Sequence, residues 1–200
     1  MGFIEKTAFE ARVSNKRKND LCNITGHYQA SGADADCSAG LLCVRKEQLP
    51  CAGFTGVLNE NAWYMEAATA AANAGDVIYA CNTYDTQLLA GRHGNAYYVG
   101  TETLGLGIPA GREGTFTKIV FDGDRTYRFG VGNANAELGT NKFLTIENGL
   151  LKPVAAAPTA NGALYFKAKG TGNFTEGTTA SFGYIDVEPH VVVAAVAVGG

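Results

Sequence analysis

The chain has 200 residues, a formal net charge of −3, a pI of about 5.6 and 18% charged residues, and this composition excludes several classes of function. A nucleic-acid-binding domain normally shows a strongly basic face, and nothing in this charge balance suggests one. The 46% hydrophobic residues exclude a disordered chain, and no apolar run approaches the roughly 18 residues of a membrane span. We therefore expect a packed protein that binds neither nucleic acid nor membranes.

The first 35 residues carry mixed charge and scattered apolar positions, among them Phe3, Ile4 and Phe9. This pattern predicts an extended N-terminal arm over residues 1–35. The chain starts without a basic segment followed by a long apolar run, so we expect synthesis and folding in a cytosol.

From about residue 40 the sequence becomes strand-like. The runs are four to eight residues long, rich in aromatic and β-branched residues, and separated by Gly, Asn, Asp or Pro. They are 41–44, 62–65, 77–81, 96–99, 116–121, 126–129, 142–146, 163–168 and 180–187. This pattern predicts a mainly β protein, either a sandwich or a barrel, with a body over residues 36–190.

Three connections in this body have their own predictions. Arg45-Lys46-Glu47 is expected to form a turn after the first run, and Asp122-Gly123-Asp124 a hairpin turn between two runs. The alanine-rich segment 65–75 ends in Asn and Gly, which could cap a short helix, but its composition does not decide between helix and loop.

A weak internal repeat aligns residues 36–85 with residues 135–187. Cys43–Leu49 corresponds to Leu144–Leu150, and Asn61–Ala67 to Gly162–Ala168. A true repeat predicts two related β lobes with residues 86–134 inserted between them, although chance similarity explains the few identities equally well.

The chain ends in an apolar run, residues 191–200, with no charge after Glu188. A strand of this kind is a pairing template for another sheet edge, so either the core or a second chain must cover it. Together with Phe3, Ile4 and Phe9 of the arm, the tail supplies the candidate partner-contact residues. Those of the tail are Val191, Val192, Val193, Val196 and Val198.

Residue patterns that support catalysis or metal binding are missing from the sequence. The five cysteines lack the paired spacing of a zinc site and are expected to be free, mostly buried thiols. His27, His93 and His190 stand alone, and no serine lies in a nucleophile elbow. We therefore expect no enzyme activity, no cofactor and no metal.

The glycine-rich segment Leu104–Gly111 has the wrong spacing and context for a phosphate loop, and a turn around Pro109 accounts for it. Its phrase Gly-Leu-Gly-Ile-Pro-Ala-Gly-Arg, residues 105–112, and Glu-Asn-Gly-Leu-Leu-Lys-Pro-Val-Ala, residues 147–155, break the strand-like runs. This combination of short strand-like runs and glycine- and proline-containing connections, across about residues 38–188, resembles the sequences of small β-rich structural proteins of tailed bacteriophages, particularly head decoration (cement) proteins.

The resemblance implies a non-enzymatic protein made in the cytoplasm of a bacterial host and bound to the capsid surface of the virion. Its partners would be the major capsid protein and further copies of itself. The chain is longer than many small decoration proteins, and the extra length requires a repeat or a second role.

Two alternatives remain open. One is another virion component, such as a minor capsid, tail or fibre protein. The other is a carbohydrate-binding β-sandwich in which Trp63, Tyr64, Tyr97 and Tyr98 stack on sugar rings.

Overall fold

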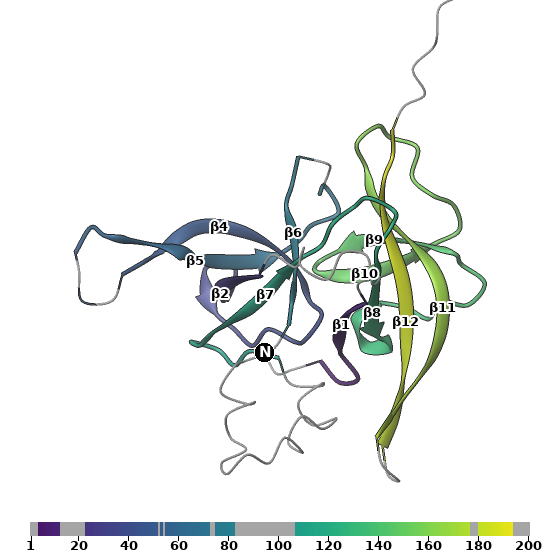
Figure 1. Ribbon diagram of the computed structural model, residues 1–200, viewed down its shortest axis with the longest axis horizontal. Helices are drawn as coiled ribbons and strands as arrows, with labels where there is room; N and C mark the ends of the chain where they lie inside the picture. Colours follow the sequence, from purple (N-terminus) through teal and green to yellow (C-terminus); the bar gives the residue numbers. More distant parts are fainter. Residues whose placement is uncertain are drawn as a thin grey trace, which may run out of the picture.

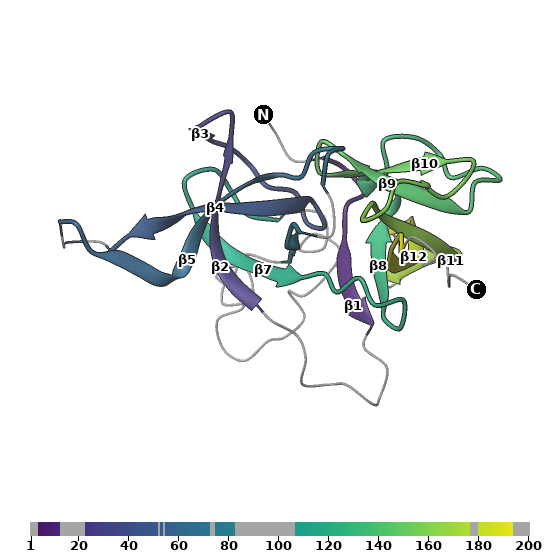
Figure 2. The same cartoon turned by 90° about the horizontal axis from the view of Figure 1, so that it is seen from above.

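The computed structural model describes residues 4–12, 23–51, 53, 55–72, 75–82, 107–176 and 180–193. These residues are almost entirely β-structure, arranged as a barrel and an open sheet that lie side by side (Figures 1 and 2). The predicted mainly β fold is therefore confirmed. The barrel strands are β2 (Asn23–Ala30), β4 (Leu42–Pro50), β5 (Leu58–Ala67), β6 (Ile78–Cys81) and β7 (Glu113–Lys118). The open sheet contains β1 (Phe9–Arg12), β8 (Thr126–Gly130), β9 (Phe143–Glu147), β10 (Leu150–Val154), β11 (Leu164–Glu176) and β12 (Ala180–Val191).

The barrel closes because β2 pairs at both of its edges. Its strand order is β2-β5-β4-β6-β7, and antiparallel pairing of β7 with β2 completes the ring. The β2–β5 pair is parallel, and the other pairs are antiparallel. The short strand β3 (Ala33–Asp34) folds back onto the end of β2. Closure leaves these strands without free edges near the middle of the barrel.

The open sheet has the order β1-β8-β12-β11-β9-β10, and every pair in it is antiparallel. Burial alternates along its strands, so that Leu144 and Ile146 of β9 are buried while their neighbours are half-exposed. A period of two places one row of side chains against the barrel and the other toward solvent.

Strand β6 is buried on both faces because it stands between two hydrophobic cores. Tyr79 and Cys81 point into the barrel, whereas Ile78 and Ala80 point toward the open sheet. All four residues of this strand are therefore apolar and enclosed, as in strands covered on both sides.

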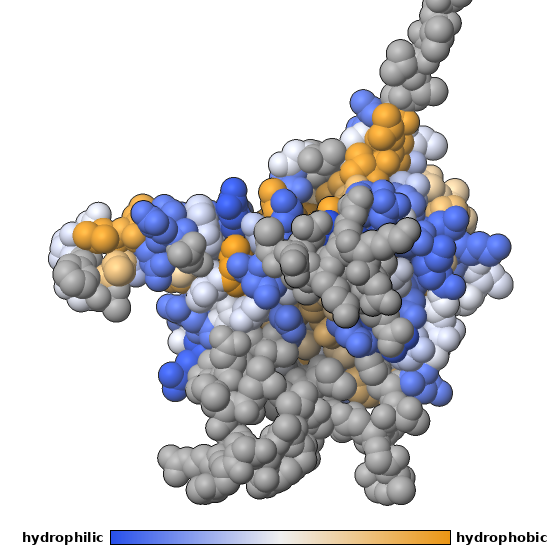
Figure 3. All heavy atoms as spheres, in the orientation of Figure 1, coloured by the Kyte–Doolittle hydropathy of each residue, from blue (hydrophilic) through white to orange (hydrophobic). Residues whose placement is uncertain are grey.

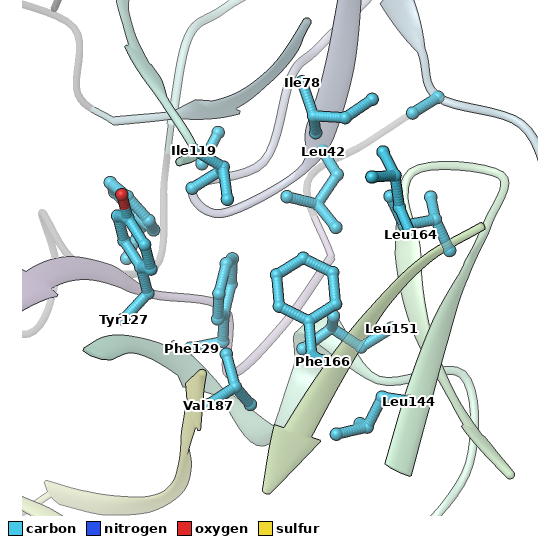
Figure 4. Packing of buried hydrophobic residues seen from close by; sticks show 14 of the residues in the cluster. Leu42, Ile78, Ile119, Tyr127, Phe129, Leu144, Leu151, Leu164, Phe166 and Val187 are labelled. Atoms are coloured by element: carbon cyan, nitrogen blue, oxygen red, sulfur yellow. The ribbon is translucent and has the colours of Figure 1, made fainter. Parts of the chain in front are cut away.

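The main core lies between the outside of the barrel and the inner face of the open sheet. In Figure 4, Leu42, Ile78 and Ile119 of the barrel face Phe129 and Phe166 of the sheet. The rings of the two phenylalanines lie 6.3 Å apart, in an edge-to-face arrangement. Each such fully buried side chain contributes about 1.5–3 kcal/mol, so this interface holds the two lobes together.

A second core fills the barrel, where Gly26 provides space for two larger side chains. A Cβ atom at Gly26 would lie 2.5 Å from Met65 Cγ and 2.5 Å from Phe116 Cδ2. Met65 and Phe116 are both fully buried, and they occupy the volume that a side chain at position 26 would need. Tight packing of this kind leaves little room for substitution.

Two hairpins extend beyond the layers that support them. Strands β4 and β5 have 9 and 10 residues, but β4 pairs with β6 only over Leu42–Val44. Strands β11 and β12 have 13 and 12 residues, whereas the neighbouring β8 and β9 have 5 each. The outer part of each hairpin is consequently a two-stranded extension (Figure 1).

The predicted N-terminal arm over residues 1–35 is corrected by the strand pairing. Residues 9–12 form an edge strand of the open sheet, and residues 23–34 form β2 and β3 of the barrel. Of the scattered apolar residues named for this region, Phe9 is an inward-facing strand position, which mixed charge in the sequence concealed.

The structure also disagrees with the proposed repeat and its insertion. Residues 43–49 lie within one continuous strand, whereas residues 144–150 turn back at Asn148, which has a positive φ of 51°. The two lobes differ in topology, one a closed barrel and the other an open sheet. The described end of the predicted insert, residues 107–134, supplies β7 to the barrel and β8 to the sheet.

Three predicted connections also differ. Arg45-Lys46-Glu47 lies inside β4, because the outer part of the hairpin is solvated and tolerates charges. The Asp122-Gly123-Asp124 turn joins β7 to β8, which belong to different lobes, and so makes no hairpin. In the alanine-rich segment, β5 extends to Ala67 and the described residues that follow, 68–72, contain no helix.

Candidate protein-binding surfaces

A groove of about 760 Å³ lies at one end of the open sheet. Its walls are the segment after β8, with Val131, Ala136 and Leu138, and the β11–β12 hairpin, with Thr171 and Ile185. Ile185 belongs to the inward-facing row of β12, so the groove continues the core surface beyond the part that the barrel covers. The result is an apolar channel that opens to solvent.

Val131 is the most prominent apolar side chain of this groove, at 39% exposed. It belongs to the 3-10 turn η2 (Val131–Asn133) that follows β8 directly. A Cβ atom at Gly183 would lie 2.7 Å from Val131 Cγ1, so the glycine allows the turn to lie on β12. Lys6 and Glu137 also line the groove and give it one charge of each sign.

The tip of the β4–β5 hairpin is a second apolar surface. Val57 and Leu58 are 48% and 54% exposed, and the Cys51 N–H donates to the Val57 carbonyl at 2.7 Å. Figure 3 shows apolar surface at the end of this hairpin, far from the body of the molecule. Two adjacent exposed aliphatic side chains give this projecting hairpin an apolar end.

The start of the predicted C-terminal strand, Val191, is the last residue of β12, and Val192 and Val193 continue from it. Val192 forms two hydrogen bonds with the segment just before β11. Its carbonyl accepts from the Gly162 N–H at 2.8 Å, and its N–H donates to the Ala163 carbonyl at 2.9 Å. Within the described residues, the opposite edge of β12 pairs with β8 only as far as Val187. On that edge the Pro189 carbonyl accepts from the Gly123 N–H at 2.9 Å. Val193 is 80% exposed, so the strand end presents apolar surface beyond this contact.

The structure divides the predicted contact residues into four groups. Val191 and Val192 are half-buried and Val193 is exposed at the end of β12. Ile4 is partly exposed, and its N–H donates to Ser38 Oγ at 2.8 Å. Phe9 packs against Tyr127 and Phe129 in the main core, so its side chain is not available to a partner. The remaining members lie outside the described residues; they are Phe3, Val196 and Val198.

A polar cluster on the outside of the barrel was missed by the sequence interpretation, which treated His27 as isolated. Its Nε2 lies 2.8 Å from Asp34 Oδ1, and Gln29 Nε2 donates to the same oxygen at 3.2 Å. These hydrogen bonds lower the pKa of Asp34, with the bond from His27 as the larger cause. The Tyr64 ring meets His27 edge-on at 5.6 Å. The bonds from His27 and Gln29 to Asp34 join β2 to β3 across their turn.

The aromatic residues proposed to stack on sugars do not form one platform. Trp63 packs against the barrel interior with Arg45 over its ring at 4.6 Å, whereas Tyr64 faces outward. Adjacent residues of a strand point to opposite faces, so these two rings cannot bind one ligand together. Tyr97 and Tyr98 lie outside the described residues.

Three cysteines lie inside the barrel, as the composition predicted. Cys37, Cys43 and Cys81 are free and fully buried, and Cys51 is free and partly exposed. Burial raises the pKa of the Cys37 and Cys43 thiols, which keeps them protonated. Cys22 lies outside the described residues, and those that are described contain no group of three metal-binding side chains.

The glycine-rich segment has a structural explanation. Ile108 and Cys37 exchange two backbone hydrogen bonds of 2.8 Å, which fixes the segment against the barrel. A Cβ atom at Gly107 would lie 2.0 Å from the Cys37 carbonyl oxygen, so only glycine fits there. The predicted turn at Pro109 is present, since its carbonyl accepts from the Arg112 N–H at 3.1 Å.

In the part of the chain that the structure describes, no helix is long and apolar enough to cross a bilayer. Comparison with protein families, with curated proteins and with solved structures gives no match.

Proposed function

We propose that this chain is a non-enzymatic structural protein of a bacteriophage particle, a decoration protein that binds the major capsid protein lattice from outside. The observation that carries the proposal is the β4–β5 extension, which projects from a rigid β body and ends in the exposed apolar residues Val57 and Leu58. Val193, which follows the end of β12 opposite the β11–β12 turn, is a second exposed apolar position. The resemblance of the sequence to phage head decoration proteins is the reason for proposing a bacteriophage particle.

The physical argument concerns the stability of such elements. A two-stranded hairpin is at best marginally stable in water, and exposed aliphatic side chains at its tip add no stability to a free monomer. Projecting apolar ends are explained when another protein surface buries them, as in strand addition to a sheet edge. On a symmetric lattice, modest contacts of this kind add through avidity.

This role places the protein on the capsid surface after synthesis in the cytoplasm of the bacterial host. Its partners would be the major capsid protein and neighbouring copies of itself. It requires no cofactor, no metal and no catalytic residue.

The first test is fractionation of the source material on a density gradient, with the chain located by peptide mass spectrometry. We expect it to sediment with megadalton particles, and labelling of intact particles should place it on the outer head surface. Recovery as a free protein of about 21 kDa would overturn the proposal. Labelling at the tail would assign it to another virion component.

The second test uses particles stripped of this protein. The double variant Val57→Ser and Leu58→Ser, and separately Val193→Asp, should rebind at least about tenfold more weakly, because each removes an apolar contact. Thr159→Asp, in an exposed loop, is the matched control and should rebind normally. Equal rebinding by all variants would show that these ends are not the contact elements.

A further inference from the structure

The apolar hairpin tip and the apolar groove lie on different parts of the chain and have complementary character. The tip presents Val57 and Leu58, which project into solvent, and the groove is lined by Val131, Leu138 and Ile185. The groove, of about 760 Å³, is large enough to receive an aliphatic side chain such as Leu58.

The two surfaces of one copy cannot meet. The β4–β5 hairpin extends from the barrel at one end of the long axis of the molecule, and the β11–β12 hairpin that walls the groove lies at the other end (Figures 1 and 2). The main core between the barrel and the sheet fixes this arrangement. Any contact between tip and groove must therefore join two copies.

The charges next to the two surfaces also match. Glu60 lies two residues after Leu58 in β5, so it is on the same face of the hairpin and is exposed. Lys6 lines the groove and is exposed. Glu137 lines the groove as well, so the match requires Glu60 to approach the Lys6 end.

We infer that the β4–β5 tip of one copy docks into the groove of a second copy, with Leu58 inserted and Glu60, on the same face of β5, beside Lys6. The contact is heterologous, since the two copies use different surfaces, and repeated from copy to copy it produces a closed ring or an open filament. The inference rests on the proposed assembly role, which supplies the high local concentration that a small contact of this kind requires.

The test uses purified protein without particles and traps the contact as a disulfide. In a Cys22→Ser background, native Cys51 marks the tip, and Ala136→Cys places a thiol on the exposed rim of the groove. Glutathione disulfide serves as the oxidant, and the protein is used at about 1 mM, which is comparable to the effective concentration of tethered binding modules. Under these conditions we expect a ladder of dimers, trimers and longer oligomers. Peptide mapping should locate the bond between Cys51 and position 136.

Two controls make this result specific. Ala155→Cys, in an exposed loop after β10, should crosslink about tenfold less, because it offers a thiol without the docking geometry. Adding Cys51→Ser to Ala136→Cys should abolish the ladder. Equal crosslinking at positions 136 and 155 would overturn the inference, and so would a single dimer band, which indicates an isologous contact.

A charge exchange provides a second, independent readout. Lys6→Glu and Glu60→Lys should each reduce self-association in sedimentation velocity experiments, and the double variant should recover it. Failure of the double variant to recover would exclude the Lys6–Glu60 pairing. Failure of the proposed function is seen separately, since particle binding and crosslinking between free copies are measured in different samples.

Discussion

The side-chain oxygen of Asn133 accepts a hydrogen bond of 3.0 Å from the backbone N–H of Ala8. The amide nitrogen of the same side chain donates to the Ala39 carbonyl at 2.7 Å. Asn133 is fully buried, and it joins the segment before β1, the turn after β8 and the loop before β4. One amide thus satisfies a backbone donor and a backbone acceptor that no solvent can reach.

Asn133→Ala should therefore lower the free energy of unfolding by about 2–4 kcal/mol, because two buried backbone groups lose their partners. Urea denaturation followed by tryptophan fluorescence measures this loss. Asn135→Ala is the control, since Asn135 bonds to Glu147 at the surface and its removal should cost less than about 0.5 kcal/mol. Similar losses in the two variants would refute the assigned role of Asn133.

Arg128 forms the most extensive ionic contact on the outer face of the open sheet. Its guanidinium donates to both Asp186 oxygens, at 2.8 and 2.9 Å, and lies 3.4 Å above the Tyr184 ring. Arg128→Lys should destabilise the fold by about 1–2 kcal/mol, because an ammonium can neither form the fork nor stack in the same way. Lys46→Gln removes an exposed 2.9 Å pair with Glu66 and should change stability by less than about 0.5 kcal/mol. Thermal unfolding of both variants distinguishes the two cases.

The cysteines should differ sharply in reactivity. Cys37 and Cys43 are enclosed in the barrel with raised pKa values, whereas Cys51 is partly exposed near the hairpin tip. Iodoacetamide should modify Cys51 at least about 100-fold faster than either buried thiol under native conditions, because the buried thiols react only after opening of the barrel. Timed alkylation followed by peptide mass spectrometry gives the three rates. Rapid native modification of Cys37 would contradict the closed barrel.

The Asp34 carboxylate should titrate below its ordinary pKa of 3.8, since His27 and Gln29 hydrogen-bond to its charged form. A depressed pKa in the folded state stabilises the fold at a pH above the unfolded value. This contribution is lost as the pH falls through the lower, folded value. Carbon-detected NMR titration of Asp34 measures it. His27→Gln should raise the pKa of Asp34 more than Gln29→Ala does, and an unchanged titration in both variants would exclude these bonds as the cause.

The sequence contained enough information to predict the strands but not their partners. Runs such as Val77–Cys81 and Thr126–Phe129 are recognisable because aromatic and β-branched residues concentrate between turns. Whether β7 joins the barrel or the sheet depends on contacts such as Phe116 against Met65, which are distant in the sequence. Local patterns carry no information about such pairings, so the sequence could not decide between a repeat and chance similarity.

The candidate sites also differ in how far local sequence could predict them. The pairing of His27 with Asp34 follows from a tight turn at Ser31 and Gly32, which have φ values of 53° and 78°. A Ser-Gly dipeptide is a recognised turn signal, so the sequence contained enough information to predict this contact. The groove could not be predicted, because its walls come from segments that only the folded sheet brings together. The burial of Phe9 was hidden for a similar reason, since its ring is covered by β8.

Strand β6 has a consequence for how the molecule unfolds and for how rigidly its two lobes are joined. Its four residues contribute alternately to the barrel core and to the core between the lobes, so neither core survives without the other. The two lobes should therefore melt in a single cooperative transition. The hairpin tip and the groove are then held at a fixed separation. If they join two copies as inferred, the fold of each copy sets the spacing between its neighbours.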